Sequence, residues 1–246
     1  MLKVGKTAKL PLKICKGSAQ ERIELAKQYN EKLFKSFKGK WLDKDVFTQE
    51  LKNVHNGKTN FTLKNANPKG FVGNTAPMCN KKEVVSYDIY LPLNKFGKKM
   101  YLRNMNIFMH ETFHYFFEIT NPKHIKNACT MHENKLNIET NKFYHDKLYN
   151  KQGDTDLIKI ALPAYIKNFY PKDQITILQS WRYRLTEEVY AYKEGAKYYE
   201  KIQDIYKDTL HKKLKCDDGS DFHFEEKIKI IEETLAKILE KVRKNL

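Results

Sequence analysis

The chain has 246 residues, 41% of them hydrophobic and 13% aromatic, so it is long enough to bury a core and excludes both a disordered protein and a stapled miniprotein. Lysine and arginine number 46 against 30 acidic residues, a net charge of +16 that favours anionic partners. Only five of the 46 are arginine, and the lysines run along the whole chain. We therefore expect a solvated, lysine-rich surface and do not favour a nucleic-acid interface.

The cysteines and the hydropathy of the sequence indicate the cellular compartment in which to expect the protein. The four cysteines, Cys15, Cys79, Cys129 and Cys216, form no CxxC pair, which predicts neither a zinc ribbon nor a disulfide framework. The sequence contains no run of 18 apolar residues and no apolar signal segment after Met1. Unless a signal was removed earlier, we expect a cytoplasmic protein without a membrane partner.

The first half of the chain predicts two helices and a small sheet. Apolar residues at helical spacing favour helices over residues 19–37 and 43–53. Short β-prone runs at 60–63, 70–73 and 83–91 are separated by Asn, Gly and Pro, which predicts three or more strands.

From about Arg103 onward the pattern is almost wholly helical. Strands first and helices afterwards indicate an α+β fold, mostly α, without βαβ alternation. The last helix is expected over about 222–244, with a heptad-like seam shorter than three heptads. Such a short seam favours packing on its own domain, and so a monomer over a homodimer. The seam consists of Phe224, Ile228, Ile231, Leu235, Ile238 and Val242.

One segment carries a recognisable chemistry. Residues 106–117 contain the pattern His-Glu-x-x-His at His110, Glu111 and His114, inside a strongly apolar stretch. Positions i and i+4 of a helix share one side, so both imidazoles can bind the same Zn²⁺. Glu111 follows the first ligand and can take a proton from a zinc-bound water. On an ordinary half-buried helix, the same polar groups would lose their hydration without gaining partners.

This pattern resembles the motif of the zincin metallopeptidases. The resemblance implies a single catalytic domain: residues 1–120 would hold helices, a small twisted sheet and the active-site helix, and residues 121–246 a helical subdomain. The metzincin pattern HExxHxxGxxH is excluded, because Phe117 and Thr120 stand where it requires Gly and His. An edge strand just upstream of the helix is expected to hold an extended protein or peptide substrate by backbone pairing.

The third ligand is expected from a later helix, as in the gluzincins, which commonly carry it in a Glu-x-x-Ala setting. The run Glu188-Val189-Tyr190-Ala191 resembles the third-ligand segment of the anthrax lethal factor and Pro-Pro endopeptidase group. Ala191 lies one turn after Glu188, and its small side chain lets the two helices approach closely. Glu187 is the alternative, about 100° around the helix.

The resemblance implies a zinc metalloendopeptidase with His110, His114 and Glu188 as ligands and Glu111 as base. Trp181 occupies the position at which that group has a tyrosine as oxyanion donor, so we assign this role to Tyr183, with Tyr192 or Arg184 as alternatives. The competing interpretation is a non-catalytic basic protein on a metallopeptidase scaffold, either nucleic-acid-associated or a virion or cargo component.

Other candidate ligands are weaker. The histidines of the charged helical region are expected to be exposed or to support the ligands. Asp154 or Asp156 would be an aspartate ligand, but the flanking residues do not reproduce the aspzincin motif. Glu118 lies too close to His110 along one helix to complete the coordination sphere. The histidines concerned are His124, His132 and His145.

Overall fold

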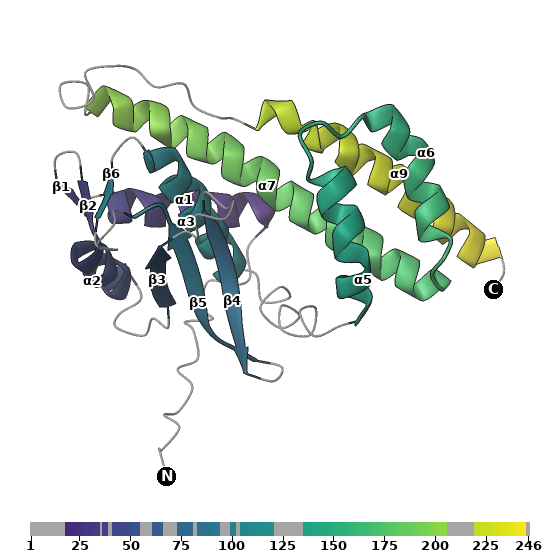
Figure 1. Cartoon of the computed structure of the whole chain (residues 1–246), viewed down its shortest axis with the longest axis horizontal. Coiled ribbons are helices and arrows are strands. Elements are labelled where there is room, and N and C mark those ends of the chain that lie inside the picture. Colours follow the sequence, from purple (N-terminus) through teal and green to yellow (C-terminus); the bar gives the residue numbers. More distant parts are fainter. Residues whose placement is uncertain are drawn as a thin grey trace, which may run out of the picture. The chain divides into compact units, whose positions relative to one another are not determined.

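The structure is a computed structural model that describes residues 18–34, 36–38, 41–54, 61–65, 73–80, 83–93, 99–101, 104–120, 135–205 and 219–244. Helices predominate and the strands belong to the first half of the chain, which confirms an α+β fold that is mostly α (Figure 1). Among these residues, no helix combines the length and apolar character needed to cross a membrane.

The chain forms two compact units. The first is built from the described parts of residues 1–131 and 194–217, and the second from those of 132–193 and 218–246. We expected a division into 1–120 and 121–246. The two compact units are discontinuous in sequence, because the 35-residue helix α7 (Pro171–Ile205) starts in the second unit and ends in the first.

The two units differ in charge. Residues 132–193 and 218–246 contain 16 basic and 15 acidic side chains, which leaves 30 basic and 15 acidic side chains for the rest of the chain. Almost the whole net charge of +16 therefore belongs to the sequence of the first unit. The positions of the lysines alone do not reveal this difference, because lysines occur along the whole sequence. The difference arises because acidic residues nearly equal the basic residues in number only in the second unit.

The described residues of the first unit form two three-stranded sheets. Strands β1 (Phe37–Lys38), β2 (Trp41–Asp43) and β6 (Lys99–Tyr101) form an antiparallel sheet in the order β1-β2-β6. The second sheet has the order β3-β5-β4: β3 (Phe61–Asn65) is parallel to β5 (Glu83–Leu91), and β4 (Asn74–Asn80) is antiparallel to it. The central position of β5 leaves β4 at one edge of this sheet.

Helix α3 (Met105–Ile119) forms the core of the first unit. It packs against α1 (Ala19–Phe34) and against β4 and β5 (Figure 1). Its side chains are apolar on nearly all sides, which is typical of a buried helix. The ring of Phe108 contacts Phe37 and, from α2 (Lys44–Val54), Phe47, with centroids 5.4 and 5.3 Å away.

Most predicted elements of the first unit agree with the structure. The first helix ends at Phe34, before the expected residue 37, and the second is shifted by one residue. The expected strand at 70–73 lies outside the described residues except for Gly73, which precedes β4. The sequence pattern missed β4 itself, because its residues do not alternate and include Pro77. Proline is tolerated at such an edge because it has no N–H to pair.

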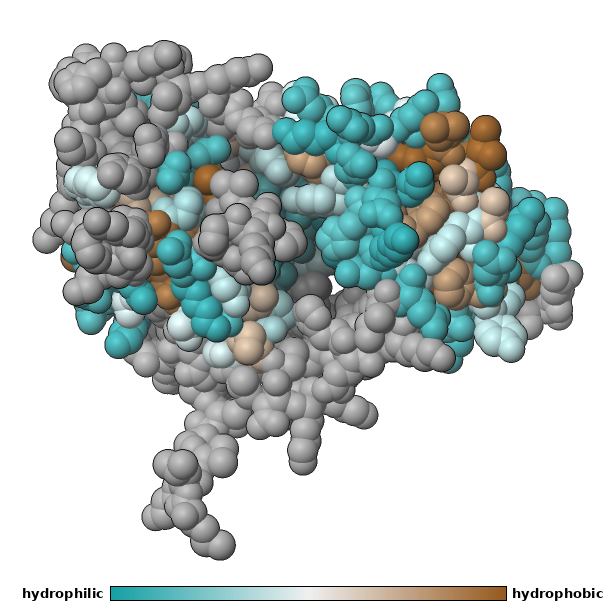
Figure 2. Space-filling view, in the orientation of Figure 1, coloured by the Kyte–Doolittle hydropathy of each residue, from teal (hydrophilic) through white to brown (hydrophobic). Residues whose placement is uncertain are grey.

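The second unit is a helical assembly around one apolar core. Its elements are α5 (Lys135–Phe143), the π-helical turn η3 (Tyr144–Leu148), α6 (Thr155–Ile166), the first part of α7, the 3₁₀ turn η4 (Ser220–Phe222) and α9 (Phe224–Lys244). The seam of α9 packs on this core, as expected, with Phe224 and Ile231 fully inside it. Figure 2 shows a hydrophobic patch over α6, where Leu157 and Ile160 are exposed.

Candidate metal site

Helix α3 brings His110 and His114 together. Both side chains are half-buried, their Nε2 atoms lie 3.1 Å apart, and their rings meet edge to face with centroids separated by 4.6 Å. The i, i+4 spacing on one continuous helix produces this convergence. Two ring nitrogens at this separation are suited to share one cation.

Glu111 is buried, with 6% of its surface exposed, and strand β4 holds its side chain. The Thr75 hydroxyl lies 2.9 Å from the main-chain oxygen of Glu111 and 3.0 Å from its Oε2. A Cβ atom added at Gly73 would lie 2.7 Å from Oε1 of Glu111 and 2.7 Å from Cγ2 of Ile107. Sequence reasoning missed Thr75 and Gly73, because β4 carries no strand pattern that would place them beside the motif.

The end of α7 belongs to the first unit, where it packs beside α3. Glu194, 8% exposed, forms an ion pair of 3.0 Å with Lys27 of α1, and Lys201 forms one of 3.1 Å with Glu31. A Cβ atom on Gly195 would lie 3.6 Å from the backbone nitrogen of His110. At this point the face of α7 that carries Gly195 is therefore turned toward the motif helix.

Helical geometry places Glu188 on this same face of α7. It precedes Gly195 by seven residues, which returns to within about 20° of the same direction at 3.6 residues per turn. Ala191 lies between them with 0% exposure, in accord with the small side chain expected there. His110, His114 and Glu188 each offer one ligand atom, and these three atoms lie within 4.8 Å of one another.

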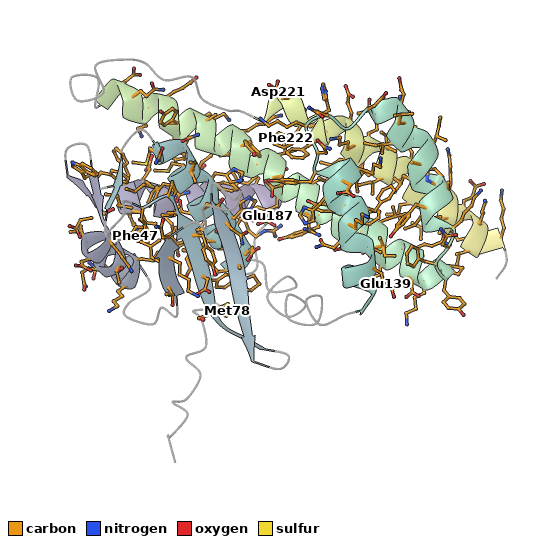
Figure 3. All side chains as sticks on the ribbon, viewed as in Figure 1. Phe47, Met78, Glu139, Glu187, Asp221 and Phe222 are labelled. Atoms are coloured by element: carbon orange, nitrogen blue, oxygen red, sulfur yellow. The ribbon has the colours of Figure 1, made fainter. Side chains whose placement is uncertain are left out.

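Glu187, the alternative ligand, is not one of the three grouped residues. It lies about 80° from the direction of Gly195; Figure 3 labels its side chain on α7. It is 4% exposed, and the group of three ligand atoms does not include it. The geometry therefore favours Glu188 over Glu187.

The negative charge of Glu188 contributes to the raised pKa values of two tyrosines of the second unit. Burial, chiefly, and the negative charge of Glu188 raise the pKa of Tyr149. Burial also raises the pKa of Tyr144, a shift that Arg184 opposes and Glu188 reinforces. Tyr144 begins the π-helical turn and Tyr149 follows it, and such turns are frequent at functional sites. The sequence gives no sign of them, because a π-helical turn has no local pattern that distinguishes it from α-helix.

The alternative oxyanion donors have structural partners in the second unit. The Arg184 guanidinium lies 3.6 Å from the centroid of the Tyr144 ring. Tyr192 packs against the ring of Phe222 at 5.3 Å. Tyr183, the preferred donor, is half-buried on α7, about 140° around the helix from Glu188.

The remaining candidate ligands have other places in the fold. Asp154 caps α6, accepting hydrogen bonds from the backbone of Asp156 and Leu157, and Asp156 pairs with Lys159 at 2.7 Å. Glu118 is buried on α3. His145 is exposed, as expected, whereas His124 and His132 lie outside the described residues.

Comparisons of the chain with protein-family models, with curated proteins and with solved structures find no match.

Proposed function

We propose that this protein is a zinc-dependent metallopeptidase. The observation that carries the proposal is the grouping of the ligand atoms of His110, His114 and Glu188 within 4.8 Å, with the buried carboxylate of Glu111 next to the first of them in sequence. Histidine pairs occur on many helices. The grouping of such a pair with a carboxylate from a helix distant in sequence is less common, and a cation bound by all three side chains would explain it.

The donor set fits zinc. Two imidazole nitrogens and one carboxylate oxygen are ligands that Zn²⁺ binds in catalytic sites, where three protein ligands leave one position open. Calcium and magnesium prefer all-oxygen sites, which His110 and His114 do not offer. When bound, zinc supplies a Lewis acid that polarises a carbonyl group and makes a water molecule more acidic.

Glu111 is proposed as the general base. Its carboxylate takes a proton from the attacking water and passes it to the amine that leaves when the peptide bond breaks. Burial and the contact with Thr75 limit the positions that this carboxylate can adopt. Tyr183 stays our prediction for a hydrogen bond to the developing oxyanion.

A peptide or protein substrate is supported by the edge position of β4. Within the described sheet, β4 pairs with β5 alone, so its other edge can take an extended chain by backbone hydrogen bonds. We expected an edge strand near the end of the 83–91 run, but in the described sheet β5 is central and β3 and β4 are the edges. Thr75 of β4 contacts the Glu111 carboxylate, so a peptide paired with β4 would lie beside the proposed base.

The charge of the first unit favours a second candidate, a non-catalytic basic protein that binds an anionic partner such as nucleic acid. A peptide-library cleavage assay with and without chelator separates the two. We expect cleavage that chelation abolishes and zinc restores. A protein that binds zinc and cleaves no member of the library would contradict a peptidase.

A further inference from the structure

We propose that Thr75 and Gly73 are positioning residues that hold the Glu111 carboxylate in the orientation needed for proton transfer. This inference rests on the proposed function and extends it to a strand outside the motif. All three residues belong to the first unit.

The Thr75 hydroxyl reaches both ends of Glu111. Its Oγ1 lies 2.9 Å from the main-chain oxygen and 3.0 Å from Oε2 of the same residue. The single hydroxyl hydrogen is shared between these two acceptors, so one group of the neighbouring strand links the carboxylate to the backbone of its own residue. A glutamate side chain otherwise has considerable rotamer freedom, and a hydrogen bond to a charged group is stronger than one between neutral groups.

Gly73 gives the carboxylate the space it occupies. A Cβ atom there would lie 2.7 Å from Oε1 and 2.8 Å from Cγ of Glu111, and 2.7 Å from Cγ2 of Ile107. These separations are far below van der Waals contact, so an alanine at this position displaces either the strand or the carboxylate. Thr75 and Gly73 therefore act on the two different oxygens of one carboxylate.

The arrangement links substrate binding to the base. In the described sheet β4 is an edge strand, and Thr75 near its start contacts the Glu111 carboxylate. A peptide that pairs with this edge lies against the strand that orients the carboxylate. An oriented catalytic group speeds a reaction only when it also lies near the reacting atoms. In this proposal β4 orients the carboxylate and also holds the peptide near it.

The activity arm of the test uses Thr75→Val, which keeps the shape of the side chain and removes the hydroxyl. We expect kcat to fall by about tenfold or more and KM to change by less than about twofold, because the substrate contacts remain. Thr75→Ser, which restores the hydroxyl, should recover most of the loss. Thr62→Val is the matched control, since Thr62 is exposed on β3 of the same sheet. Gly73→Ala should lower kcat as well.

The second arm of the test measures stability and requires neither bound metal nor catalytic activity. In the metal-free protein, a double-mutant cycle combines Thr75→Val with Glu111→Ala and measures the equilibrium constant of unfolding by urea. The wild type shares the single hydroxyl hydrogen of Thr75 between two oxygens, whereas Glu111→Ala leaves it to the main-chain oxygen alone. Because a hydrogen bond to the carboxylate is the stronger of the two, Thr75→Val should raise this constant by about threefold more in the wild-type background than with Glu111→Ala. Equal effects in the two backgrounds would overturn the inference.

The outcomes separate this inference from the proposed function. If the wild type cleaves peptides and Thr75→Val keeps its full kcat, the positioning role is wrong and the peptidase stands. If the wild type loaded with zinc cleaves nothing, the proposed function fails and the positioning role fails with it. A positive cycle would then identify a structural contact alone.

Discussion

Lys227 offers a test of the second unit that is independent of any metal. The side chain is fully buried on α9, and its Nζ donates a hydrogen bond of 2.8 Å to the main-chain oxygen of Asn150. Gly153 makes room for it: a Cβ atom there would lie 3.0 Å from Nζ. Burial lowers the pKa of Lys227 to about 8 from the ordinary 10.5.

The sign of the pH dependence follows from this lowered pKa. Between about pH 8 and pH 10.5 the folded state releases the proton of Lys227 while the unfolded state keeps it. The free energy of unfolding therefore rises with pH in this window. With 1.36 kcal/mol per pKa unit, the rise between about pH 7 and pH 9.5 amounts to about 2 kcal/mol. Above about pH 10 the trend reverses, because burial keeps tyrosines such as Tyr144 protonated in the folded state.

The assay is urea unfolding followed by tryptophan fluorescence. Of the two tryptophans, Trp181 lies in the core of the second unit with 2% exposure, so a Trp41→Phe background restricts the signal to that unit. Lys227→Met should remove the rise with pH. Lys229→Met, an exposed position on the same helix, should keep it. If the free energy of unfolding of the wild type does not change with pH, or rises equally in Lys227→Met, then Lys227 is not the source of the pH dependence.

Two further predictions concern the site. Glu111→Gln should leave zinc binding intact and lower the cleavage rate by about 10²-fold or more, because the variant keeps the shape of the side chain and loses a positioned base; unchanged turnover would remove Glu111 from the mechanism. Glu188→Ala should weaken zinc binding, measured by competition with a chelator, far more than Glu187→Ala, because only Glu188 shares the face of α7 that carries Gly195. Equal or reversed losses would transfer the ligand to Glu187 or to another residue.

The parts of the site that share one helix were predictable from sequence. His110, Glu111 and His114 are fixed relative to one another by helical geometry alone, and the apolar residues around them predict a buried helix. The pair Glu188 and Ala191 was recognisable for the same reason, because its spacing is local. Local periodicity is the information that a single sequence carries best.

The contribution of β4 depends on contacts far apart in sequence. Thr75 pairs with Ile89 across the sheet and reaches Glu111 from another element, so no residue pattern within 74–80 reveals either contact. The course of helix α7 depends on distant contacts in the same way. The helix is continuous in sequence, and its end belongs to the first unit, where Glu194 and Lys201 form ion pairs with α1 and Gly195 lies close to His110.

The zinc content of the purified protein is the most direct test of the proposed metal site. The protein, purified without added metal, is analysed by elemental mass spectrometry beside His110→Ala and, as a control, His145→Ala, which replaces an exposed histidine. We predict about one zinc per chain in the wild type and in His145→Ala, and none in His110→Ala, since a catalytic site needs all three protein ligands. A metal-free wild type that also fails to take up added zinc, or an undiminished zinc content in His110→Ala, would contradict the account.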